Sequence, residues 1–156
     1  MVNDDLRSFL GSVQEARFQY QRAVSREQEL RDRCERITAG WDTGPSGSGD
    51  IHKDGPLVAL AQAHGELRPL YQAWEQAEER VDRFLDGIRD TRYKAILKYR
   101  YVDLYRWPRI KKELEKCGIY YEERQMFRLH GEALNEAREL WRARQENQET
   151  TEEEEI

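Results

Sequence analysis

The feature that most constrains this chain is a regular stripe along residues 57–88, whose positions step by three and four residues throughout. Eight of its ten positions are apolar. This spacing is typical of a helix that packs lengthwise against a partner helix. The ten positions are Leu57, Leu60, His64, Leu67, Tyr71, Trp74, Glu78, Val81, Leu85 and Ile88.

A second long helix is predicted for residues 4–38, with a similar but less regular stripe that is interrupted at Arg17, Glu27 and Arg31. Residues 39–56 between the two helices have the Gly-, Ser- and Asp-rich composition of a flexible linker. Two stripes of matching length joined by such a linker predict an antiparallel helical hairpin over residues 1–87. The apolar positions of the first stripe are Leu6, Leu10, Val13, Tyr20, Val24, Cys34 and Ile37.

Two residues of the second helix carry expectations of their own. Pro69 lies inside the helix and predicts a kink there, because proline removes one backbone hydrogen bond. His64 lies on the stripe without a second His, Cys or carboxylate at ligand spacing. We therefore expect a partly buried structural histidine and not a metal ligand or a switch.

Residues 88–148 predict three shorter helical segments. The first covers residues 88–102 and ends in a turn at residues 103–106. The second begins at Trp107, with Pro108 in the first turn, and Gly118 ends it as a left-handed cap. The third begins near Tyr121 and presents an apolar face through Met126, Leu129, Ala133, Ala137 and Leu140. The expected fold class is all-α: a long, coiled-coil-like antiparallel hairpin followed by a three-helix module.

Charge is distributed unevenly along the chain, although the net charge is only −5. Residues 1–87 hold 11 Lys/Arg and 16 Asp/Glu, residues 88–144 hold 15 and 9, and residues 145–156 hold none and 6. A block of net charge +6 therefore lies between two acidic blocks. Because residues 145–156 lack apolar periodicity, they are expected to form a disordered acidic tail.

Several classes of function are disfavoured by the sequence. The GPSGSG run in the linker lacks the Gly-Lys-Ser/Thr ending of a phosphate-binding loop. Cys34 and Cys117 fit no metal or redox spacing, and no Ser/His/Asp or Cys/His set suggests catalysis. No signal peptide is recognisable, and no apolar stretch approaches the ~20 residues that span a bilayer. We expect a cytoplasmic protein that is not an enzyme, with no metal and no cofactor.

The order of helix, short helix with an initial proline, glycine turn and longer helix is that of a helix-turn-helix unit. Side chains suited to DNA contact gather on its last two helices: lysines would meet phosphates, and Arg or Gln would reach base edges. An ordinary solvated helix face is the alternative explanation. The candidate DNA-binding residues are Arg106, Arg109, Lys111, Lys112, Lys116, Arg124, Gln125 and Arg128.

The same region resembles the sigma-factor region-4-like regulators of phages and prophages, the RinA/ArpU type of late-gene activators. Residues 96–102 (ILKYRYV), Trp107 with Ile110, and residues 128–134 (RLHGEAL) carry the resemblance. It covers residues 88–141, and it implies DNA binding by the helix at 121–134 and contact with RNA polymerase or promoter DNA. The turn before that helix is longer than in the family, and Glu122 and Glu123 stand where a small capping residue is usual.

These observations predict a phage- or prophage-derived transcription regulator that binds duplex DNA through residues 106–130. The hairpin would then supply a homodimer interface or a contact with RNA polymerase. The alternative is a phage-encoded inhibitor or adaptor that binds a host protein through the hairpin and acidic surface, without DNA contact. Pairing of the basic side chains with Glu113, Glu115, Glu122, Glu123 and Glu136 would favour the alternative.

Overall fold

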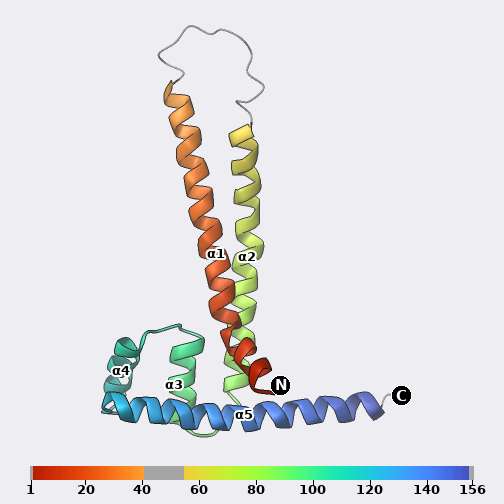
Figure 1. The fold of residues 1–156 in the computed structure, drawn as a ribbon, viewed down its shortest axis with the longest axis vertical. Helices are drawn as coiled ribbons and strands as arrows, with labels where there is room; N and C mark the ends of the chain where they lie inside the picture. Colours follow the sequence, from red (N-terminus) through yellow and green to blue (C-terminus); the bar gives the residue numbers. More distant parts are fainter. Residues whose placement is uncertain (1, 41–54, 155–156) are drawn as a thin grey trace. The chain divides into compact units, whose positions relative to one another are not determined.

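The chain is described by a computed structural model that covers residues 2–40 and 55–154. All regular structure in these residues is helical, which confirms the expected all-α class (Figure 1). The predicted linker lies mostly outside the described residues. The helices are α1 (Val2–Ala39), α2 (Gly55–Leu85), α3 (Thr91–Tyr101), α4 (Trp107–Lys116) and α5 (Glu123–Glu154).

The chain divides into two compact units. One consists of Met1–Gln14 with Gln76–Ile156, and the other of Glu15–Glu75. The division falls inside α1 and α2 and not at residue 87/88, where the sequence suggested a boundary. It falls there because Leu6, Leu10, Val81 and Leu85 are buried in the same unit as α3, α4 and α5.

Within the unit of residues 15–75, the two long helices contact one another with opposite chain directions. The ring of Tyr20 lies 5.4 Å from that of Tyr71 and 5.7 Å from that of Trp74. Further along α1, the Glu27 carboxylate lies 3.7 Å from Nδ1 of His64. Glu27 also accepts a hydrogen bond from Arg31. Of the polar residues that interrupt the stripe of α1, Glu27 therefore contacts α2, and the Arg17 guanidinium lies 5.9 Å from the Trp74 ring centre of α2.

In several turns of α2, the buried residue is the one just before the position that the stripe predicted. Ala63 and Ala77 are buried, whereas Leu57 is 56% exposed and Tyr71 43% exposed. The side chain of His64 is 71% exposed, so the expectation of a partly buried histidine is wrong. Adjacent residues on a helix point about 100° apart. A small alanine allows closer packing of helices than the larger side chain beside it, which is then turned toward solvent.

The unit of residues 1–14 and 76–156 contains most of the buried side chains. In Figure 1, α3 and α4 lie beside the N-terminal half of α5, whereas its C-terminal half extends away from them. Lys98 on α3 forms ion pairs of 3.0 Å with Asp82 and 2.6 Å with Asp86. The apolar core residues of the three helices are Ile96, Leu97, Ile110, Leu114, Met126, Leu129, Ala133 and Ala137.

The acidic end of the chain requires a correction. The sequence predicted disorder over residues 145–156, but α5 continues as helix through Glu154. Glu and Gln are strong helix formers, so the segment can extend a helix that has already been nucleated. Thr150 and Thr151 also donate hydrogen bonds to backbone carbonyls one turn earlier, at 2.6 and 2.7 Å. The absence of apolar periodicity reflects exposure and not disorder, since residues 146–151 are exposed although helical.

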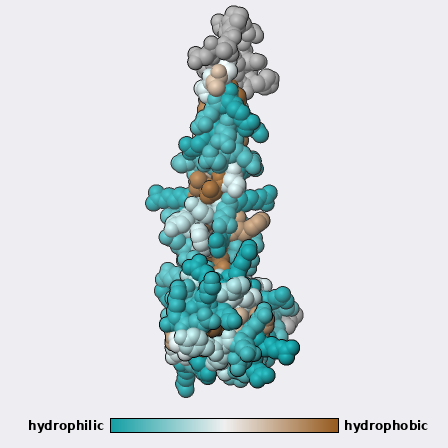
Figure 2. Space-filling model, turned by 90° about the vertical axis from the view of Figure 1, so that its left-hand side faces the viewer, coloured by the Kyte–Doolittle hydropathy of each residue, from teal (hydrophilic) through white to brown (hydrophobic). Residues whose placement is uncertain are grey.

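The face of the protein in Figure 2 is mostly hydrophilic, and apolar side chains show on it only in small, separate patches. This agrees with a composition in which 37% of residues are charged. No helix in the part of the chain that the structure describes is long and apolar enough to cross a membrane.

Candidate nucleic-acid interface

Helix α4 begins and ends where the sequence indicated. It starts at Trp107 with Pro108 in its first turn, where the missing N–H of proline costs no hydrogen bond. At its end, Gly118 has a φ of +82°. Its N–H donates to the Glu115 carbonyl at 3.0 Å, and the N–H of Ile119 donates to the Leu114 carbonyl at 2.9 Å. This pair of bonds is a Schellman cap, and it confirms the predicted left-handed glycine.

The turn from α4 to α5 spans residues 117–122 and is longer than the three or four residues usual in helix-turn-helix units. At the start of α5, the backbone N–H of Glu122 donates to Oε1 of Gln125 at 2.9 Å. This bond is one half of a capping box, in which the third helical residue reaches back to the cap. The Gln125 side-chain oxygen therefore caps the N-terminus of α5. Glu122 and Glu123 also lie at the end of the helix dipole that favours negative charge.

The structure places all eight candidate DNA-binding residues on exposed parts of one unit. Arg109 lies over the ring of Tyr105, 3.8 Å from its centre, and Lys116 pairs with Glu113 at 3.1 Å. The other five basic residues form no ion pair with any described residue, so their charges are available to a ligand. These five are Arg106, Lys111, Lys112, Arg124 and Arg128.

The acidic residues nearby are mostly not used to neutralise this basic set. Of the five glutamates named above as possible partners, only Glu113 pairs with a candidate residue among the described part of the chain. Glu136 instead accepts the backbone N–H of Arg89 at 3.4 Å. Glu132 accepts the Tyr93 hydroxyl at 3.0 Å, which ties α3 to α5. The acidic residues of α5 thus hold the module together on one side and leave Arg124 and Arg128 unpaired.

A cluster of aromatic side chains around His130 fixes α3, α4 and α5 together. The Tyr101 hydroxyl and Nε2 of His130 share a hydrogen bond of 3.1 Å. The Trp107 ring lies edge-on to His130, with centroids 4.9 Å apart, and Arg100 lies over Trp107 at 5.0 Å. Burial, together with the positive charge of Arg100, lowers the pKa of His130 to about 4. His130 is therefore a neutral packing residue at physiological pH.

This pKa predicts a pH dependence of stability. An unfolded histidine titrates near pH 6.5, so between about pH 6.5 and pH 4 the unfolded chain binds more protons than the folded chain at this position. The contribution of neutral His130 is complete above about pH 6.5 and is lost as the pH falls toward 4. At about 1.4 kcal/mol per pKa unit the full difference corresponds to about 3.5 kcal/mol, and solvent screening of this partly exposed ring reduces the expected loss to roughly 2–3 kcal/mol.

Urea denaturation at several pH values checks this expectation in the parent and in a His130→Gln variant, which removes the titrating ring. The variant should lose less stability than the parent between pH 6.5 and 4, whatever its stability at pH 7. Carboxylates titrating in the same range are present in both proteins, so the difference isolates the histidine. Parallel curves would contradict a neutral, buried His130.

Two aromatic residues near the candidate interface were not predicted from the sequence. Tyr120 in the turn before α5 is 77% exposed, and Tyr105 lies beneath the guanidinium of Arg109. Arg92 also donates to the Tyr121 hydroxyl at 3.1 Å, which joins α3 to the same turn. The only sequence signal was a pair of tyrosines between a glycine cap and a helix start. An exposed ring there can stack on a sugar or a base.

The described residues contain no group of three or more His, Cys, Asp or Glu side chains that could hold a metal ion. Comparison of the chain with protein-family models, with curated proteins and with solved structures finds no match in any of the three.

Proposed function

We propose that this protein is a DNA-binding transcription regulator of the helix-turn-helix type, in which α4 meets the phosphate backbone and the first turns of α5 enter the major groove. The observation that carries the proposal is the set of five exposed, unpaired basic side chains on these two helices. Unpaired exposed cations cost little in water and gain most when they replace the counterions of a polyanion.

In this proposal α4 and α5 contact different parts of the DNA. Lys111 and Lys112 lie on the exposed side of α4, opposite the buried Ile110 and Leu114, and suit phosphate contacts. Arg124 and Arg128 lie one turn apart at the start of α5, where recognition helices contact base edges. Arginine can form two parallel hydrogen bonds with guanine. The phosphate contacts supply most of the affinity, and the α5 arginines supply the sequence preference.

The resemblance to sigma-factor region-4-like regulators supports the same assignment and extends it. It implies a phage or prophage origin and a contact with RNA polymerase or promoter DNA, and a cytoplasmic site of action is proposed with them. In this proposal residues 88–144 form the helix-turn-helix module, and residues 1–87 form an antiparallel helical hairpin. The hairpin would be the part that contacts the polymerase.

A second candidate function, that of an inhibitor or adaptor that binds a host protein, is favoured by a separate observation. In the unit of residues 15–75, Phe18 is 59% exposed, Leu57 56% and Val58 54%. Leu57 and Val58 are neighbours at the start of α2, and large apolar side chains that gather on a helix surface mark sites of protein contact. Such a protein would bind its partner equally well after nuclease treatment and would not bind purified DNA.

Salt dependence of DNA binding by the full-length chain tests the proposal. Fluorescence anisotropy with a labelled duplex should give an affinity whose logarithm falls linearly with the logarithm of salt concentration. Lys111→Ala together with Lys112→Ala should flatten that slope by about 2, because each lost phosphate contact removes about one unit. At low salt the affinity should fall about tenfold or more.

The matched control removes two positive charges from the other unit, with Arg22→Ala and Arg26→Ala, both of which are exposed. This variant should keep the parent slope. If the protein does not bind duplex DNA at low salt, or if both variants change the slope equally, the proposed interface is wrong. Absence of DNA binding would favour the protein-binding function.

A further inference from the structure

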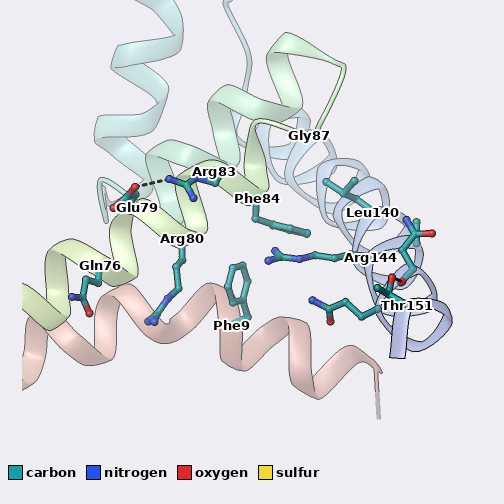
Figure 3. Close-up of a pocket in the computed structure, with 13 residues that line it drawn as sticks. Phe9, Gln76, Glu79, Arg80, Arg83, Phe84, Gly87, Leu140, Arg144 and Thr151 are labelled. Atoms are coloured by element: carbon teal, nitrogen blue, oxygen red, sulfur yellow. Dashed lines mark hydrogen bonds and ion pairs between the residues drawn. The ribbon is translucent and has the colours of Figure 1, made fainter. Parts of the chain in front are cut away.

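A groove with a volume of about 860 Å³ lies in the unit of residues 1–14 and 76–156, away from the candidate DNA-binding residues. The C-terminal parts of α2 and α5 form its walls, and Phe9 of α1 lies at its base (Figure 3). Phe9 and Phe84 give the groove an aromatic floor, with their rings 5.3 Å apart. Trp141 does not line the groove but packs against both rings, 4.9 Å from Phe9 and 5.5 Å from Phe84.

Arginines line the groove above this floor. Arg80 and Arg83 come from α2, and Arg144 comes from α5 and points toward Phe84 (Figure 3). Arg83 pairs with Glu79 at 2.6 Å, whereas Arg80 and Arg144 form no ion pair with any described residue. An apolar floor bordered by unpaired cations fits an acidic helix end that follows a short apolar stretch, as the end of α5 follows Leu140 and Ala143.

The end of α5 has the complementary character. Every residue from Glu146 to Thr151 is exposed, and its last turn holds no basic residue. By sequence, residues 145–156 carry six acidic and no basic side chains. Negative charge at a helix C-terminus opposes the helix dipole, and an uncovered helix end of this length is only marginally stable in water. A neighbouring surface of positive charge would relieve both costs.

We propose that the groove binds the C-terminal end of α5 from a second copy of this chain, and that the second copy receives the first in the same way. The result is a two-fold dimer in which two α5 helices lie antiparallel between two α2 helices. This inference does not depend on the proposed function, since it uses none of the DNA-binding residues.

Helix geometry supports this occupant. The residues of α5 that line the groove form two rows with four-residue spacing on one face of the helix: Leu140, Arg144 and Gln148 in one row, and Ala143, Asn147 and Thr151 in the other. At about 100° per residue, Glu146 and Glu149 lie on the opposite face. When the lining faces of two α5 helices meet, each helix therefore turns these two glutamates toward Arg80 and Arg83 of the other copy.

Charge along α5 selects the antiparallel direction. Residues 138–144 hold three arginines and one glutamate, and residues 145–156 carry a charge of −6. An antiparallel pair brings the basic end of one helix near the acidic end of the other, which lowers the electrostatic energy of the pair without requiring direct ion pairs between the two meeting faces. A parallel pair would place the two acidic blocks together, and like charges in contact are destabilising. A self-complementary patch of this kind closes as a dimer and does not extend into a fibre.

Sedimentation equilibrium of the full-length chain, with exchanged charges, tests the dimer. The parent should dimerise at micromolar concentration, more weakly at high salt. Arg80→Glu with Arg83→Glu reverses the charge of the groove, and Glu146→Arg with Glu149→Arg reverses the charge of the helix end that enters it. Each variant alone should raise the dimer dissociation constant at least about tenfold. An equimolar mixture of the two variants should restore dimerisation as a heterodimer.

Arg22→Glu with Arg26→Glu makes the same change of charge as the first variant, in the other unit, and should leave the parent dimer intact. Restoration in the mixture shows that both variants are folded. A parent chain that stays monomeric at about 100 µM would overturn the proposal. So would a mixture that fails to associate, or a dimer that the Arg22 and Arg26 variant disrupts, because the interface would then lie on residues 15–75.

Discussion

Replacing Val81 with aspartate is expected to destabilise the protein by at least about 3 kcal/mol. Val81 is fully buried on α2, in the unit that also buries Leu85 and Ile88. An ionised carboxylate there would have no partner, and burial of an unpaired charge is among the few changes that cost this much. Thermal denaturation followed by circular dichroism should show a melting temperature lower by about 10 °C.

Glu79→Lys is the matched control, because it changes charge two residues away on the exposed side of α2. The Glu79 side chain is 67% exposed, and its ion pair with Arg83 is exposed as well. The expected effect is within about 0.5 kcal/mol. Leu67→Asp should lie between the two, since Leu67 is only half-buried. If Val81→Asp melts like the parent, α2 does not bury this face.

The helical elements could be predicted well, because each has a local cause. Stripes at three- and four-residue spacing located α1 and α2, and Pro108 and Gly118 located the two ends of α4 to the residue. The Schellman cap depends only on six consecutive residues, so its signal is complete in the sequence. The expected kink at Pro69 remains a prediction, although α2 does continue through that residue.

Features that depend on packing were harder to predict. Whether Ala63 or His64 lies on the buried face of α2 depends on how closely the partner helix approaches. The regular three- and four-residue spacing predicted burial at His64, whereas Ala63 is the buried residue. The extent of α5 was missed for a related reason. Apolar periodicity indicates which face of a helix is buried. A helix that is solvated all round shows no such pattern, even where Glu and Gln favour helix along it.

The position of the candidate site could be predicted from the sequence, but the contacts that its individual side chains make could not. The exposed arginines and lysines follow from their places opposite Ile110, Leu114, Met126 and Leu129. The capping role of Gln125 needs the exact start of α5, which sequence patterns place only to within a few residues. The stacking of Arg109 on Tyr105 depends on the path of the turn before α4, where Leu104 has a φ of +57°. The sequence contained no signal for that backbone conformation.

Loss of the two α5 arginines is expected to remove sequence preference while leaving most of the salt dependence in place. A preferred duplex can be obtained by repeated selection from random sequences with the full-length chain. Arg128→Ala should then reduce the ratio of affinities for the preferred and a scrambled duplex by about 1–3 kcal/mol, or roughly five- to 150-fold. Arg124→Ala combined with Arg128→Ala should bring the ratio close to one.

Two comparisons distinguish base contact from simple attraction. Lys111→Ala with Lys112→Ala should lower the affinity for both duplexes equally, because phosphates carry no sequence information. Arg22→Ala, in the other unit, should change neither the affinity for the two duplexes nor the ratio between their affinities. A Gln125→Ala variant should lower stability more than it lowers the affinity ratio, since its side-chain oxygen caps the start of α5. If the arginine variants lower affinity for both duplexes by the same factor, Arg124 and Arg128 contact phosphates, and base recognition belongs to other residues, of which the exposed Tyr120 is the nearest candidate.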